Sequence, residues 1–183
     1  MKAINLWSIP SFLQFYGHTH VDEFQIFYNE RGYPTNVAYV APSITPYHGL
    51  NPSYRLYTVG VGGAVLDTRT YVTDLQAANQ RPDLEPEYRL LYSARAAYTM
   101  ADLSPVSWHQ LVTRLQTDPA LFSTFYRHYN SGGEAACDPV CRRRLICRLV
   151  SARSHDTEAL CGHLHLAPRH EGGGWLGWLG DLG

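Results

Sequence analysis

Apolar residues alternate with polar ones along much of the first 75 residues, a period typical of strands with one buried face. Residues 21–28 show it most clearly, because Phe24, Ile26 and Tyr28 fall on one face. Shorter apolar runs end at a glycine or a proline, which are common where strands stop. The pattern predicts strands at residues 12–16, 21–28 and 37–41.

A glycine-rich turn joins two further runs of strand-forming residues. Residues 54–59 and 64–75 flank the segment 60–63, which contains three glycines. Glycine readily takes the positive φ angles that a tight hairpin turn needs. We therefore predict a β-hairpin over residues 54–75.

After residue 79 the apolar spacing changes from two to three and four, the period of an amphipathic helix. An aspartate followed by a proline matches an N-cap followed by a first-turn proline. Predicted helix starts are Glu85-Pro86, Asp118-Pro119, Asp138-Pro139 and Asp156. The residues at this spacing are Tyr88, Leu91, Tyr92 and Arg95, then Trp108, Leu111, Val112 and Leu115, then Phe122, Phe125, Tyr126 and Tyr129. We interpret this aromatic stripe as helix core rather than as a ligand site.

The change of pattern gives the fold class α/β and divides the chain in two main parts. The predicted parts are an atypical amino-terminal segment (1–11), a strand-rich part (12–79), a helical part (80–166) and a glycine-rich tail (167–183). The tail has little periodicity, so we expect it to be poorly ordered.

Composition excludes several classes of protein. The chain is 45% hydrophobic and 17% charged with a formal net charge of -1, which argues against intrinsic disorder and against a nucleic-acid partner. No apolar run approaches the roughly 18 to 20 residues of a transmembrane segment. Asn5, Ser8 and Pro10 interrupt the first apolar run, so we expect no signal peptide in this chain.

Four cysteines lie close together, at Cys137, Cys141, Cys147 and Cys161. An even number suits two disulfides in an oxidising compartment, and four cysteines allow three pairings. A zinc site of four thiolates is the weaker alternative, because its paired cysteines usually have two residues between them. The spacings here are three, five and thirteen residues. Free thiols are the remaining possibility.

A basic cluster, Arg142-Arg143-Arg144 with Arg148, lies between these cysteines. Such a cluster is compatible with binding to anionic lipid or nucleic acid. Four charges in one predicted helix more often form a solvated helix face, and we favour that interpretation.

Two histidines, His18 and His20, follow the first predicted strand and Gly17. Neutral imidazole is a good zinc ligand. On a regular strand the two rings would point to opposite faces, whereas in a loop both can point into one cleft. Such a pair can serve two metal ions about 3.5 to 4 Å apart, the arrangement used in phosphoester hydrolysis. Ordinary surface histidines are the alternative.

The sequence around these histidines resembles the carboxy-terminal part of the acid sphingomyelinase family, over residues 12–166. The matching segments are Gly-His-Thr-His-Val-Asp-Glu-Phe (17–24), Ala-Pro-Ser-Ile-Thr-Pro-Tyr-His-Gly-Leu-Asn-Pro (41–52) and Tyr-Arg-Leu-Tyr (54–57). Residues 137–141 (Cys-Asp-Pro-Val-Cys), 149–153 and 159–164 extend the resemblance.

The resemblance implies the carboxy-terminal portion of a calcineurin-like metallophosphoesterase, a layered α/β sandwich, followed by a small helical, disulfide-bonded domain. It implies that His18 and His20 are ligands in a site of two zinc ions and that Tyr47 lies beside the substrate head group. It also implies that Cys137 pairs with Cys141 and Cys147 with Cys161. The implied reaction is zinc-assisted hydrolysis of sphingomyelin to ceramide and phosphocholine, at a membrane surface, in a lysosomal or secreted protein.

The chain departs from the family pattern in ways that bear on activity. It lacks the motifs Asp-x-His, Gly-Asp-x-x-Asp and Gly-Asn-His-Asp/Glu, the histidine that protonates the leaving group, and the saposin-like segment. The single Asn-x-Ser/Thr site, at Asn51, is blocked by Pro52. We therefore expect a partial chain with no catalytic residue of its own, inactive in isolation. The alternative is a noncatalytic fragment or isoform that binds lipid or modulates the full-length enzyme.

Overall fold

The computed structural model describes residues 14–162, which contain two three-stranded sheets. The first sheet comprises β1 (Gln14–Tyr16), β2 (Glu23–Tyr28) and β3 (Pro34–Val40). Its order is β1-β3-β2, with β1 parallel and β2 antiparallel to β3. These strands confirm the three predicted ones within residues 14–40, although β3 begins at Pro34 rather than at residue 37.

The second sheet contains the predicted hairpin and is antiparallel throughout. Its strands are β4 (Ser53–Val59), β5 (Val65–Val72) and β6 (Arg89–Ser93). Gly62 and Gly63 have φ angles of 89° and 83°, as the glycine-rich turn requires. β5 ends before residue 75, because Asp74 accepts a hydrogen bond from the Ala77 N–H and so caps α1 (Leu75–Asn79).

The prediction of a helix that begins at Glu85-Pro86 is wrong. Residues 89–93 form β6 instead, and only α2 (Ala94–Ala97) that follows it is helical. The apolar spacing of Leu91 and Tyr92 fits a strand as well as a helix over so short a run. The edge of β5 that does not pair with β4 pairs with residues 89–93, and this pairing favours a strand over a helix.

The remaining helices include three at predicted starts, Asp118-Pro119, Asp138-Pro139 and Asp156, and three whose starts the sequence did not predict. They are α3 (Pro105–Thr117), α4 (Pro119–Tyr129), α5 (Pro139–Val150) and α6 (Thr157–Cys161), with the short 3-10 helices η1 (Tyr47–Gly49) and η2 (Ser154–Asp156). The side chains of Ser104, Asp118 and Asp138 accept hydrogen bonds from first-turn N–H groups of α3, α4 and α5. Each of these helices has a proline in its first turn, which the sequence predicted for α4 and α5.

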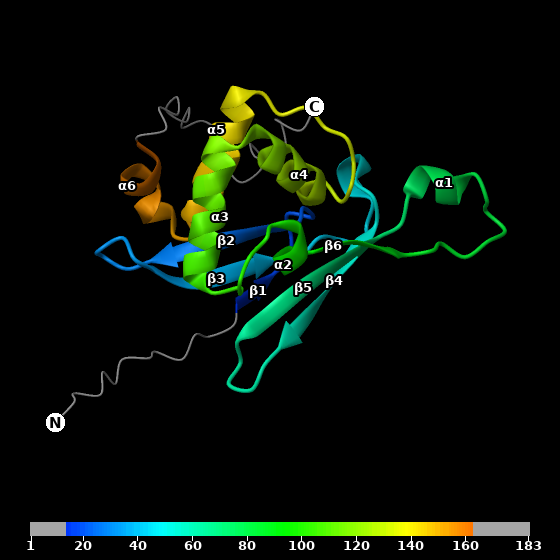
Figure 1. Cartoon of the computed structure of the whole chain (residues 1–183). Coiled ribbons are helices and arrows are strands. Elements are labelled where there is room, and N and C mark those ends of the chain that lie inside the picture. The colour runs from blue at the N-terminus through cyan, green and yellow to red at the C-terminus, as the bar shows by residue number, and fades with distance from the viewer. Residues whose placement is uncertain (1–13, 163–183) are drawn as a thin grey trace.

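Helices α3, α4 and α5 lie on one side of the first sheet (Figure 1). α3 contacts β3 and α5 contacts β2. The ring of Trp108 on α3 lies 4.1 Å from that of Phe24 on β2, and Phe125 on α4 lies 5.9 Å from Phe24. The aromatic stripe is therefore core, as we interpreted it. One cluster of buried side chains includes residues from both sides of residue 80, so the strand-rich and helical parts share a core.

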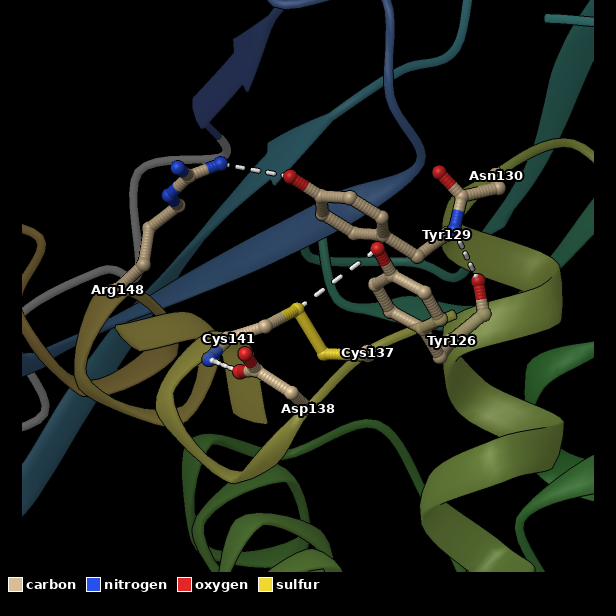
Figure 2. The surroundings of a disulfide bond; sticks show 7 residues. All are labelled: Tyr126, Tyr129, Asn130, Cys137, Asp138, Cys141 and Arg148. Carbon is tan, nitrogen blue, oxygen red and sulfur yellow. Dashed lines mark hydrogen bonds between the residues drawn. A yellow bond between two sulfur atoms is a disulfide. The ribbon is translucent and has the colours of Figure 1, made fainter. Parts of the chain in front are cut away.

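Two disulfides join Cys137 to Cys141 and Cys147 to Cys161, which confirms the pairing implied by the family resemblance. The first closes a short loop at the start of α5, where Asp138 accepts a hydrogen bond from the Cys141 N–H (Figure 2). The second connects α5 to α6. The zinc-thiolate and free-thiol alternatives are both wrong, because every cysteine is disulfide-bonded.

The basic cluster is not simply a solvated helix face. Arg142 donates to the Leu115 carbonyl at 2.6 Å, and its guanidinium lies 4.8 Å from the Phe122 ring. Arg148 donates to the Tyr129 hydroxyl at 2.6 Å (Figure 2). These two arginines therefore bind α5 to neighbouring elements, a role that sequence spacing could not distinguish from solvent exposure.

The predicted amino-terminal segment (1–11) and glycine-rich tail (167–183) lie outside the described residues. Within residues 14–162, no helix has the length and hydropathy needed to cross a bilayer. The fold class is confirmed: an α/β chain with two sheets, followed by helices that carry both disulfides.

Candidate metal centre

The two loops singled out by the sequence leave the same end of the first sheet. The histidine loop (residues 17–22) follows β1, and residues 41–52 follow β3. Because β1 and β3 are parallel neighbours, their carboxyl ends lie side by side. The Ala41 N–H donates to the Tyr16 carbonyl at 2.8 Å and joins the two loops at their origin. Sites in α/β folds commonly gather at the carboxyl ends of strands.

A pocket of about 470 Å³ lies between these loops and β4. Both histidines line it, together with apolar and hydroxyl side chains from residues 41–45. The wall from β4 is formed by Ser53, Tyr54 and Arg55. Both sheets therefore contribute to the site.

Both histidines have left-handed backbone conformations, with φ angles of 83° at His18 and 63° at His20. Non-glycine residues adopt this region rarely, and it persists only when surrounding contacts enforce it. The loop thus turns away from the strand direction, as the convergence of two imidazoles on one pocket requires.

His20 and Tyr47 are in contact, with ring centroids 5.5 Å apart. The Tyr47 side chain is 50% exposed and lies beside His20, outside the set of residues that line the pocket. The Nδ1 atom of His20 is buried and has no hydrogen-bond partner, which is costly unless another ligand satisfies it. His18 and His20 therefore line one pocket, and Tyr47 contacts His20. Their roles as ligands and head-group contact stay predictions.

The fit to zinc is partial. Imidazole nitrogens suit zinc, and the unsatisfied Nδ1 of His20 offers a free donor atom. Within residues 14–162, however, no group of three or more His, Cys, Asp or Glu side chains could hold a metal ion. The described residues supply two imidazoles of a donor set that needs about three per catalytic zinc.

A buried ion pair beside the pocket was missed by the sequence analysis. The guanidinium of Arg55 contacts the Asp22 carboxylate, and both side chains are almost fully buried. The hydroxyls of Tyr92 and Thr70 donate to the two oxygens of Asp22 at 2.8 and 2.7 Å. Asp22 ends the histidine loop, whereas Arg55, Thr70 and Tyr92 come from β4, β5 and β6. The pair therefore joins the histidine loop to each strand of the second sheet.

Glu23, the next residue in the sequence, has a second buried carboxylate. One oxygen of Glu23 lies 3.5 Å from Arg148 on α5, and the Glu23 side chain is 1% exposed. Burial raises the pKa of Glu23, while the charge of Arg148 limits that rise. A sequence signal for both carboxylates was present: two adjacent acids open a strand whose neighbours are apolar.

The polar network continues from Tyr92 to His128 on α4. Their rings are stacked at 4.1 Å, and the Tyr98 hydroxyl is hydrogen-bonded to His128 Nδ1 at 2.9 Å. Burial, helped by the charge of Arg127, lowers the pKa of His128 to about 4. His128 is therefore a neutral core residue at pH 7, in a network that reaches the candidate site through Tyr92 and Asp22.

The loop after β3 is held by a separate set of bonds. Asn51 donates to the Ser131 carbonyl at 3.2 Å, and the hydroxyls of Ser53 and Ser131 are 2.8 Å apart. Ser131 lies just after α4 and is fully buried. Both loops of the site are thus anchored to the α4 region, because the Asp22 N–H also donates to the Tyr129 carbonyl at 3.1 Å.

The family model described as "Acid sphingomyelin phosphodiesterase C-terminal region" matches residues 33–159. The chain belongs to this family. Tyr47 and three of the four cysteines lie within the matched residues, whereas the histidine loop precedes them.

Three curated relatives are similar to a larger share of the chain. A sphingomyelin phosphodiesterase from Bos taurus is 45% identical over 160 residues, covering 82% of this chain and 25% of the relative. One from Homo sapiens is 44% identical over 160 residues with the same coverage, and sphingomyelin phosphodiesterase 2 from Caenorhabditis elegans is 40% identical over 165 residues, covering 82% and 26%. The chain therefore spans about a quarter of the length of these relatives.

Proposed function

We propose that this chain forms the carboxy-terminal part of a zinc-dependent sphingomyelin phosphodiesterase and that His18 and His20 are two of its zinc ligands. The observation that carries the proposal is the convergence of both histidines on one pocket, with a buried His20 nitrogen that has no partner. Membership of the acid sphingomyelin phosphodiesterase family supports the assignment of the reaction.

The proposed reaction is hydrolysis of a phosphodiester. The oxygen of water forms a bond to phosphorus, and the bond between phosphorus and the ceramide oxygen breaks, which yields ceramide and phosphocholine. Bound zinc supplies Lewis-acid polarisation of the phosphoryl oxygens. We assign no general acid or base within residues 14–162. In this proposal, the groups that activate the water and protonate the leaving oxygen therefore lie outside these residues.

The side chains of the pocket have separate roles in this proposal. His18 and His20 bind metal, and the half-exposed ring of Tyr47 contacts the head group beside His20. Arg55 also lines the pocket, but its charge is already paired with buried Asp22. We therefore assign Arg55 no direct contact with the phosphate.

The proposed partner is a lipid surface. Ile44 and Tyr47 are 63% and 50% exposed on the loop that borders the pocket. Exposed apolar and aromatic side chains at a site rim suit contact with the interfacial region of a membrane. Two disulfides support a lysosomal or secreted location, since such bonds persist in oxidising compartments.

The noncatalytic alternative has one observation in its favour, the absence of a third metal donor among the described residues. Two donors bind zinc too loosely to fix a nucleophile. In either case the isolated chain should bind zinc weakly and release no phosphocholine, and the two proposals differ in whether a completed donor set restores turnover.

Zinc titration by calorimetry tests the proposed ligands. The 183-residue chain is expected to give a saturable zinc signal that disappears in His18→Ala/His20→Ala, with no zinc-dependent phosphocholine release from either protein. His155→Ala is the matched control, since this histidine is 73% exposed and distant in sequence. Equal zinc binding by the double variant and the control would refute the assignment. Phosphocholine release by the unmodified chain above the double variant would mean that further ligands complete the site.

A further inference from the structure

We infer that Arg55 is a positioning residue that holds the histidine loop in shape through Asp22, an inference that rests on the function proposed above. Arg55 lies within β4 of the second sheet, whereas the histidine loop follows β1 of the first. The contact between Arg55 and Asp22 therefore crosses from one sheet to the other.

Hydrogen bonds from β5 and β6 surround the contact between Arg55 and Asp22. Nε of Arg55 donates to the Thr70 hydroxyl at 3.1 Å, and its NH2 group donates to the Tyr92 hydroxyl at 3.0 Å as well as to Asp22. Each hydroxyl in turn donates a hydrogen bond to the Asp22 carboxylate, at 2.7 Å from Thr70 and 2.8 Å from Tyr92. Nε and NH2 of Arg55 and both hydroxyls thus have acceptors, and the carboxylate is held in one orientation.

The histidine loop needs such a constraint. His18 and His20 both have positive φ angles, which L-residues keep only when neighbouring contacts enforce them. The amino end of the loop is fixed by the bond between the Tyr16 carbonyl and the Ala41 N–H. At the carboxyl end, Asp22 is fixed by its side chain and by its N–H bond to the Tyr129 carbonyl. Arg55 supplies the charge that makes burial of the Asp22 carboxylate tolerable.

Arg55 is suited to this role because its guanidinium is a planar fork. A lysine at this position would keep the charge but could not donate along the directions of both Nε and NH2. Arg55→Lys is therefore the informative variant: it preserves the ion pair and removes the geometry. Arg69→Lys is the matched control, since Arg69 lies on the neighbouring strand with a side chain that is 53% exposed.

Hydrogen exchange of the full chain measures the constraint without metal. In Arg55→Lys, the amides of residues 17–22 are expected to exchange about 10-fold faster than in the unmodified chain, while those of α3 stay unchanged. Arg69→Lys should leave both segments unchanged. Identical exchange of residues 17–22 in the two variants would overturn the inference. An increase spread evenly over the sheets and α3 would also overturn it, because it would indicate a general loss of stability.

Zinc chloride provides the second readout, with the ring signals of His18 and His20 followed by NMR. Arg55→Lys is expected to need about 10-fold more zinc than Arg69→Lys to shift these signals, the effect typical of a residue that orients ligands. Equal zinc dependence in both variants would contradict the positioning role. If zinc shifts neither ring in the unmodified chain, the proposed function fails, whereas the exchange result still decides whether Arg55 positions the loop.

Two milder variants keep the inference testable if Arg55→Lys does not fold. Thr70→Val and Tyr92→Phe each remove one hydroxyl from Asp22 and leave the ion pair intact. Each should accelerate exchange within residues 17–22 by a smaller factor, whereas Thr58→Val on the exposed part of β4 should not. No change in residues 17–22 for both variants would refute the role of this network.

Discussion

Replacing Asp22 with alanine is expected to lower the free energy of unfolding by about 4 kcal/mol. The variant leaves the Arg55 guanidinium buried without its counter-charge and removes the acceptor used by Thr70 and Tyr92. Urea denaturation followed by circular dichroism measures the change.

Asp83→Ala serves as the control for this measurement, because Asp83 is exposed and its loss should cost less than about 0.5 kcal/mol. In Asp22→Ala/Arg55→Ala, the loss should be smaller than the sum of the two single losses, since no unpaired charge is left in the core. A loss for Asp22→Ala close to that of the control would show that the ion pair does not join the two sheets.

Acidification from pH 6.5 to pH 4 is expected to weaken the fold through His128. Burial lowers the pKa of His128 to about 4 in the folded state, whereas the unfolded value is near 6.5. Between these values the unfolded chain binds a proton that the folded chain excludes, so stability falls as pH falls. The full contribution is present above pH 6.5, and its loss amounts to roughly 3 kcal/mol.

Comparison of two variants isolates this contribution from other titrating groups. His128→Gln should be less stable at pH 7 but should show a flatter stability profile between pH 6.5 and pH 4. His155→Gln, at an exposed histidine, should keep the profile of the unmodified chain. Parallel profiles for His128→Gln and the unmodified chain would mean that another group controls the acid sensitivity.

Sequence periodicity predicted most of the elements because their local signals agree with their packing. Residues 21–28 alternate and contain β2, in which Phe24, Ile26 and Tyr28 are buried, and Asp118 and Asp138 cap helices at the predicted places. Local signals do not suffice for residues 89–93. Their apolar spacing fits a strand or a helix, and pairing with β5 makes them a strand. Tertiary pairing of this kind leaves no periodic mark in the sequence.

The candidate site was predictable only in part, for a related reason. A shared motif pointed to His18 and His20, and the parallel pairing of β1 with β3 places Tyr47 nearby. The contact of Asp22 with Arg55 joins a loop residue to a strand residue 33 positions later, so no local pattern encodes it. Cysteine spacing likewise left three pairings open, and family resemblance alone indicated the observed one.

A chimera gives the most direct test of the proposed function. Residues 14–162 of this chain would replace the matching region of the human sphingomyelin phosphodiesterase, to which the chain is 44% identical. We predict zinc-dependent sphingomyelin hydrolysis within about 10-fold of the human enzyme, and a loss of at least about 100-fold in the chimera that carries His18→Ala/His20→Ala, because metal catalysis is worth several kcal/mol. An active chimera whose turnover is unaffected by the double substitution would contradict the assignment of these histidines as zinc ligands.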